Sequence, residues 1–263
     1  MNRRKLVLFA LAAMVLSVAV MAVVLLGADL YLHHRAERSA GLNRWGYRGP
    51  VVGRKAPGEV RIAMLGGSTT FGYGVTWDEA LPAMLERELQ ARPDGARFRT
   101  INLGFNNEGA FASVPTMADY AWLDYDIVAL YHGYNDILGE GGPNTAVYRH
   151  DSPVFRLTGY FPILPLALQE KAMAIRAGGN LDAAYEAARH GAAPKVTFTP
   201  NAAQRTSAGA LEALSGATLA LANQLDKVTA KAAPQAPAGD EKCERPWRHF
   251  CDSMYRSVKY ARD

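Results

Sequence analysis

The longest apolar segment of the chain runs from Leu6 to Ala28 without a charged residue. As a helix it would extend about 34 Å, at about 1.5 Å per residue, which exceeds the roughly 30 Å of a membrane's hydrocarbon core. The alternative is a cleaved signal peptide, whose apolar region is usually only about 7–15 residues long. No clear small-residue cleavage site precedes Asp29, so the pattern favours an uncleaved membrane anchor over residues 1–32.

Downstream of residue 59, short apolar runs alternate with segments of helical periodicity. The runs predict three strands, over residues 60–65, 99–104 and 126–131. The third run, DIVALY, is apolar at nearly every position, as expected for a strand that is covered on both faces. Strand, helix, strand, helix, strand is the pattern of an α/β protein with a parallel sheet and flanking helices.

Two of the predicted helices carry an apolar face. The first follows a T-x-x-E capping box of Thr76 and Glu79, and it continues to about residue 90. Its apolar face comprises Trp77, Leu81, Met84, Leu85 and Leu89. The last helix of the chain has an apolar stripe of Trp247, Phe250, Met254 and Val258. Such a stripe predicts that this helix packs against a sheet.

The remaining segments set the domain organisation. Residues 33–59 are polar and aperiodic, with Gly and Pro, which predicts a juxtamembrane stalk. The α/β domain is predicted over residues 60–263, with an insert at about 138–242 that contains helical stretches near 166–177 and 203–231.

Charge excludes one class of partner and orients the chain. Lys and Arg total 29 against 25 Asp and Glu, and three of the cations are Arg3, Arg4 and Lys5, so the remaining balance is 26 against 25. Without a basic patch, no nucleic-acid partner is expected. The basic cluster before the apolar segment predicts a cytoplasmic N-terminus. In a bacterium this makes the chain a single-pass inner-membrane protein with its domain on the periplasmic side.

Two cysteines, Cys243 and Cys251, lie close together near the C-terminus. In an exported domain they are expected to form a small disulfide loop. Two unpaired thiols are the alternative.

Polar, Gly- or Asn-rich segments follow all three predicted strands. They are GGSTT from Gly66, GFNNEG from Gly104 and HGYNDI from His132. Ligands of open α/β sheets bind outside the carboxyl ends of the strands. The glycines before Ser68 would let the backbone bend tightly and keep side chains away from a substrate. A phosphate-binding loop is the alternative, but GGST lacks the Gly-Lys-Ser/Thr ending of a P-loop.

In this order, the three segments resemble the motifs of the SGNH (GDSL-like) hydrolase family. The matching elements are Gly66-Gly67-Ser68, the loop NLGFNNEGA and Gly133-Tyr134-Asn135-Asp136. The preceding stretch, LNRWGYRGP, also looks like that of membrane-anchored relatives. The resemblance covers about residues 44–137 and implies a flavodoxin-like parallel sheet.

The resemblance also implies the site residues. Ser68 would be the nucleophile and would donate its backbone N–H to an oxyanion. Asn135 would be the side-chain donor. The family's second-motif glycine corresponds to Asn107 if the spacing from Asn102 is kept, or to Gly109 if the loop is two residues longer. Neither a metal nor an organic cofactor is implied.

The family's catalytic base, a late Asp-x-x-His, has no counterpart in the sequence. His132 falls inside the third motif and is expected to close the strand. His150, His190 and His249 have no geometric support as the base. The expectation is therefore a C-terminally truncated SGNH fold that does not turn over esters as this chain.

The predicted function is a membrane-anchored serine ester hydrolase that forms an acyl-serine. Its substrate would be an ester of an acetylated glycan or of a lipid. Two alternatives stay open: an acetyltransferase of envelope glycans that uses the same serine, and a non-catalytic module that binds a glycan or a protein.

Overall fold

The computed structural model describes five stretches of the chain, which are 3–93, 96–137, 153–179, 199–229 and 247–263. The chain divides into two compact units. The first comprises residues 1–35 and 162–222, and the second comprises 36–161 and 223–263. Much of the predicted insert at 138–242 falls outside the described residues.

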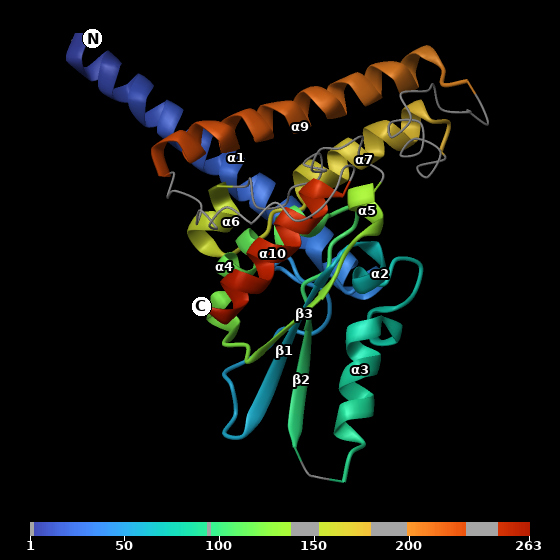
Figure 1. Ribbon diagram of the computed structural model, residues 1–263. Coiled ribbons are helices and arrows are strands. Elements are labelled where there is room, and N and C mark those ends of the chain that lie inside the picture. Colours follow the sequence, from blue (N-terminus) through green and yellow to red (C-terminus); the bar gives the residue numbers. More distant parts are fainter. Residues whose placement is uncertain (1–2, 94–95, 138–152, 180–198, 230–246) are drawn as a thin grey trace. The chain divides into compact units, whose positions relative to one another are not determined.

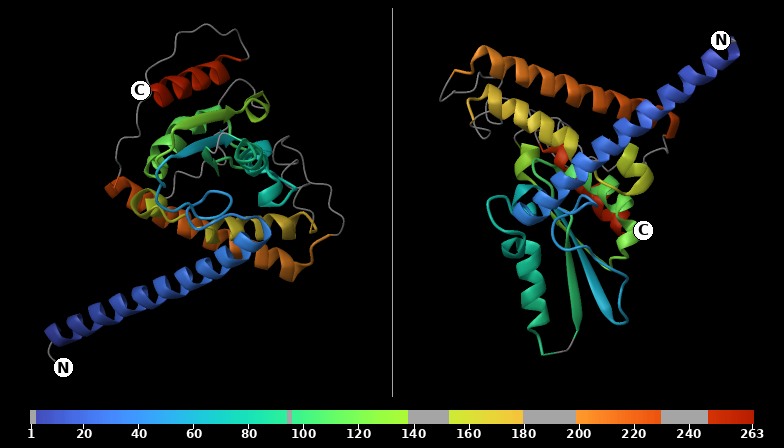
Figure 2. Two further views of the ribbon diagram at one scale, coloured as in Figure 1. Left: turned by 90° about the horizontal axis from the view of Figure 1, so that it is seen from below. Right: turned by 180° about the vertical axis from the view of Figure 1, so that it is seen from behind.

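The first unit is helical. Helix α1, Arg3–Ser39, is long and apolar enough to cross a membrane, as predicted. Helices α7, Leu164–Arg176, and α9, Ala202–Thr229, match the predicted helical stretches, and Figure 2 shows them side by side. The Asp29 carboxylate of α1 accepts a hydrogen bond from the Leu164 N–H at 2.6 Å, so it satisfies one of the free donors at the start of α7.

The second unit is built on a parallel sheet of the order β2-β1-β3, which confirms the predicted α/β class (Figure 1). The strands are β1, Glu59–Gly66, β2, Arg97–Asn102, and β3, Ile127–Tyr131. Central β1 pairs with both neighbours, and its apolar residues Ala63 and Leu65 are fully buried. The sequence predicted all three strands, although β2 begins and ends two residues earlier than expected. The expectation that β3 is covered on both faces is wrong for the described residues, since Ile127 and Tyr131 are 45% and 55% exposed.

Helices α2, α3 and α4 contact the strands of the sheet, and further helices accompany them. The longer helices of this unit are α3, Leu81–Gln90, α4, Ser113–Asp119, α6, Pro153–Thr158, and α10, Arg248–Arg262. The shorter ones are α2, Ser68–Phe71, η1, Trp77–Glu79, η2, Ala110–Ala112, η3, Ala121–Leu123, and α5, Tyr134–Ile137. Helix α3 contacts β2 and α4 contacts β1. Since β1–α3–β2 and β2–α4–β3 step across the sheet in opposite directions, right-handed crossovers put α3 and α4 on opposite faces.

The helix predicted from Thr76 begins later than expected. The capping box of Thr76 and Glu79 is present, but it caps only the short η1. The chain is extended at Ala80, and α3 starts at Leu81 because Pro82 lacks an N–H and favours the first turn of a helix. The predicted apolar face is wrong at its N-terminal end, where Trp77, Leu81 and Met84 are 40%, 40% and 49% exposed.

The segment after α1 is packed into the second unit. Residues Asn43, Tyr47 and Arg48 are buried, although the sequence predicted a polar stalk over 33–59. Tyr47 packs edge-on against Tyr120, with ring centroids 6.0 Å apart. Asn43 and Arg48 therefore serve internal hydrogen bonds rather than solvation.

Helix α10 packs against η2, α4 and α5, so it covers helices rather than the sheet directly. Ser257 is its fully buried residue, whereas Trp247 and Val258 of the predicted apolar stripe are exposed. Cys251 on this helix is disulfide-bonded, as predicted, and Cys243, the chain's other cysteine, lies outside the described residues.

Candidate active site

The turn after β1 carries Ser68 at the first position of α2. Gly67 is the extended residue before the helix, and Ser68 itself is half-buried. The N–H groups of Gly72 and Tyr73 both donate to the Ser68 carbonyl at 2.9 Å. Ser68 therefore lies in a tight strand–turn–helix at the carboxyl end of the central strand, where α/β proteins bind ligands.

Two glycines precede Ser68 because other parts of the chain come too close for a side chain. A Cβ at Gly66 would overlap the Thr70 hydroxyl and the Tyr131 carbonyl. A Cβ at Gly67 would lie 2.5 Å from the Asn135 Nδ2. The glycine pair thus lets the carboxyl ends of β1 and β3 approach each other.

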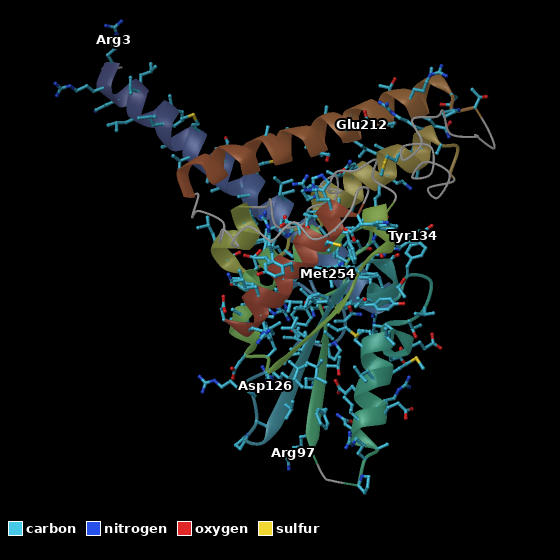
Figure 3. The ribbon with its side chains drawn as sticks, viewed as in Figure 1. Arg3, Arg97, Asp126, Tyr134, Glu212 and Met254 are labelled. Carbon is cyan, nitrogen blue, oxygen red and sulfur yellow. The ribbon has the colours of Figure 1, made fainter. Side chains whose placement is uncertain are left out.

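The Asn135 carboxamide comes from α5, which follows β3. Its neighbour Tyr134 lies at the end of the sheet opposite to Arg97 and Asp126 (Figure 3). Asn135 is 7% exposed, and its Nδ2 donates to the Glu108 carbonyl at 2.9 Å. A carboxamide has two N–H donors, so one of them holds the side chain in place while the other can serve a ligand.

The loop GFNNEG, which follows β2, also contacts Asn135, through the Glu108 carbonyl. Asn107 has a φ of +62°, the left-handed conformation that glycine adopts most readily. Gly109 is extended, with a φ of −102°, but a Cβ there would lie 2.5 Å from the Asp136 Oδ1. The two candidates for the second-motif glycine therefore meet different requirements, one of backbone conformation and one of close packing.

Asp136 ties the second loop to the third. Its Oδ1 accepts a hydrogen bond from the Ala110 N–H at 2.9 Å. Burial raises the pKa of the Asp136 carboxyl, and hydrogen bonds from the backbone oppose part of this rise. Asp136 is part of the third sequence motif, but the motif predicted no function for it.

His132, at the end of β3, is hydrogen-bonded to a serine other than Ser68. Its Nε2 lies 2.8 Å from the hydroxyl of Ser113, a buried residue at the start of α4. Burial lowers the pKa of His132 to about 4, so the imidazole is neutral at ordinary pH. The prediction that His132 closes the strand agrees with this arrangement. Nothing in the sequence pointed to Ser113.

The other histidines divide between the two units and the undescribed segments. His33 is buried in α1, 3.6 Å from Asp29, and His249 is exposed on α10. His150 and His190 lie outside the described residues. The absence of the base therefore stays a prediction.

Beside this site lies a cavity of about 190 Å³ between residues 47–52, α3 and β2. Its lining includes Arg48, Trp77, Glu86 and Arg99, but neither Ser68 nor Asn135. Among the described residues, no group of three or more His, Cys, Asp or Glu is placed to hold a metal ion.

Comparison with known proteins identifies no family for this chain. No protein-family model matches the chain, and no curated protein matches it. Among solved structures, a mutant of the esterase AlinE4 matches with 17% sequence identity and a TM-score of 0.27, over 80% of this chain and 97% of that one. At this TM-score the likeness carries no inference about fold or chemistry.

Proposed function

We propose that the chain is an SGNH-type serine ester hydrolase that acts on O-acyl or O-acetyl esters through Ser68. The observation that carries the proposal is the approach of Asn135 to Gly67, which brings the first and third motifs within contact distance. A carboxamide N–H held beside a half-buried serine at the end of a strand suits an acyl-transfer site.

In this mechanism the Ser68 Oγ attacks the ester carbonyl and loses its proton to a base. The oxyanion accepts hydrogen bonds from the Asn135 Nδ2, the Ser68 N–H and the N–H of Asn107 or Gly109. Each such donor contributes about 2.7–4 kcal/mol in the transition state. The C–O bond to the alcohol then breaks, the alcohol takes up the proton, and water hydrolyses the acyl-serine.

The test is labelling of the protein by a fluorophosphonate, followed by peptide mapping. Where the full-length protein supplies a base, we expect the label on Ser68 and none on the Ser68→Ala variant. Ser113→Ala is the matched control, because Ser113 is the serine that is hydrogen-bonded to a histidine. Equal labelling of wild type and Ser68→Ala, or a label that disappears with Ser113→Ala, would refute the assignment.

A module that binds its ligand without turnover is the second candidate. The observation that favours it is the hydrogen bond of His132 to Ser113, which leaves this histidine engaged away from Ser68. Hydrolysis of p-nitrophenyl acetate that depends on Ser68 would exclude this candidate. Turnover that instead requires an added glycan acceptor would identify the acetyltransferase.

The proposed location is the inner membrane, with α1 as the anchor and the α/β unit on the periplasmic side. The basic residues before the apolar segment support this orientation. Protease treatment of spheroplasts should digest the α/β unit, whereas protection until lysis would contradict the orientation.

A further inference from the structure

Arg48 reaches the Ser68 turn from the segment that precedes β1. Its side chain is buried, with an exposed fraction of 4% for the residue. Its guanidinium donates to four backbone carbonyls, three of which belong to the turn that follows Ser68. The acceptors are Ala40 (2.5 Å), Phe71, Gly72 (2.5 Å) and Val75 (2.5 Å).

The turn needs these donors because α2 is only one turn long. The last carbonyls of a helix have no partner within the helix, and a cation near them is favourable. The Phe71 carbonyl also accepts a hydrogen bond from the Asn102 Nδ2 at 3.2 Å. The Arg48 guanidinium lies 4.6 Å from the centre of the Phe71 ring, which adds a cation–π contact.

A lysine could not form this arrangement. Burial lowers the pKa of Arg48, so the site disfavours a charge unless the N–H groups are hydrogen-bonded. The planar guanidinium offers five donors in a fixed fork, whereas an ammonium offers three on one atom. The four carbonyls accept from all three guanidinium nitrogens, Nε, Nη1 and Nη2, which matches the fork.

We propose that Arg48 is a positioning residue that fixes the Ser68 turn by holding the carbonyls of Phe71, Gly72 and Val75. The inference rests on the proposed function of Ser68. The side chain is bonded to the backbone of the turn, so it sets the direction of the serine through that backbone.

The matched control is Arg61, a second buried arginine that also donates to backbone carbonyls. It is 2% exposed and donates to Leu123 at 2.6 Å and to Gly53 at 2.8 Å. Arg61 lies near the start of β1, at the far end of the strand from Ser68. Arg61 also forms an ion pair with Glu59 at 2.7 Å. Replacement of either arginine by lysine disturbs several buried bonds, but only those of Arg48 belong to the Ser68 turn.

The experiment compares fluorophosphonate labelling of Ser68 in the full chain, in Arg48→Lys and in Arg61→Lys. We expect the labelling rate at saturating probe to fall about 10- to 100-fold in Arg48→Lys, with the probe's affinity unchanged. Arg61→Lys should label like the wild type even if its melting temperature falls as much as that of Arg48→Lys. Equal labelling rates in the two variants would overturn the inference.

Hydrogen exchange of the Gly72 and Tyr73 amides gives a readout that does not need a reactive serine. Both amides donate to the Ser68 carbonyl. Their exchange rates should therefore rise in Arg48→Lys and stay at the wild-type value in Arg61→Lys. If a full-length protein that supplies a base does not label but this exchange pattern appears, the proposed function fails and the role of Arg48 in the turn stands. Unchanged exchange in Arg48→Lys would overturn the positioning role itself.

Discussion

The Asn135 side chain donates to the Glu108 carbonyl at 2.9 Å, and its Nδ2 fills the space that a side chain at Gly67 would occupy. One residue thereby connects the chain segments that follow β1, β2 and β3. The hydrogen bond to Glu108 fixes the orientation of the carboxamide, and the second N–H of the same nitrogen is the one available to a ligand.

Replacement of Asn135 by alanine should act on the reaction rate more than on substrate binding. The donor is used when charge develops on the ester oxygen, so we expect kcat to fall about 10²- to 10³-fold with little change in KM. Loss of the bond to Glu108 should also cost about 1 kcal/mol of stability.

Asn43→Ala separates these two effects. Asn43 is a buried asparagine whose Nδ2 donates to the Gly49 carbonyl at 3.0 Å, away from the Ser68 turn. We expect a similar loss of stability with unchanged kcat. A rise in KM alone for Asn135→Ala, or an equal fall of kcat in both variants, would contradict the assigned role of Asn135.

Gly67→Ala should displace the Asn135 carboxamide without altering any group that takes part in the reaction. The new Cβ would lie 2.5 Å from Nδ2 and 3.1 Å from the Glu108 carbonyl. We expect Ser68 labelling to fall at least about tenfold. Gly53→Ala is the control, because nothing lies within 4 Å of its Cβ position. Equal labelling of the two variants would show that the contact at Gly67 is unimportant.

The sequence predicted the sheet because each strand carries its signal locally. The segments around Ala63 and Val128 are mostly apolar over five or six residues, the segment around Ile101 is more polar, and all three end in polar loops, which places both strand and turn. The approach of Asn135 to Gly67 was indicated only by the order of the three motifs, since hydrophobic periodicity does not relate two positions that are 68 residues apart.

Contacts between distant segments were beyond the sequence. Arg48 looked like part of a polar stalk, because its acceptors are backbone carbonyls that have no signature in the residue types. The hydrogen bond between Ser113 and His132 was missed for the same reason. Pro82 indicates the late start of α3, whereas the capping box at Thr76 indicated an earlier one.

His132 should make the folded state lose stability as the pH falls. Its folded pKa is about 4, below the usual 6.5, so between these values the unfolded chain binds a proton that the folded chain does not. Stability is therefore complete above about pH 6.5 and decreases towards pH 4, by up to about 3 kcal/mol. Urea unfolding of the protein in detergent across this range measures the slope.

The comparison that isolates this effect is His132→Gln, which should flatten the slope. Asp136 acts in the opposite sense, because a raised carboxyl pKa gives stability that is lost as the pH rises. Because Asp136 is present in both proteins, its contribution cancels when the slope of His132→Gln is subtracted from that of the wild type. An identical slope in the two proteins would mean that His132 titrates normally in the fold.

The disulfide of Cys251 should leave no free thiol in the oxidised protein under denaturing, non-reducing conditions. The chain's other cysteine is Cys243, so the closed loop would be short and would stabilise the fold by about 2.5 kcal/mol. Reduction should lower the midpoint of unfolding, whereas Cys243→Ser should not respond to reductant. Two thiols in the oxidised sample would exclude the bond.

The final prediction concerns Asn107, and it separates the conformation of its backbone from the chemistry of its side chain. Its φ of +62° suits glycine, and alanine there should cost about 1–2 kcal/mol because its Cβ crowds the carbonyl oxygen. Asn107→Gly and Asn107→Ala both remove the carboxamide, but only Asn107→Gly keeps this conformation relaxed. If Asn107 stands where the family has its glycine, the glycine variant should match wild-type Ser68 labelling and the alanine variant should label more slowly. Equal losses in both would show that the side chain is what matters, and unchanged labelling in both would leave Gly109 as the remaining candidate for the third donor.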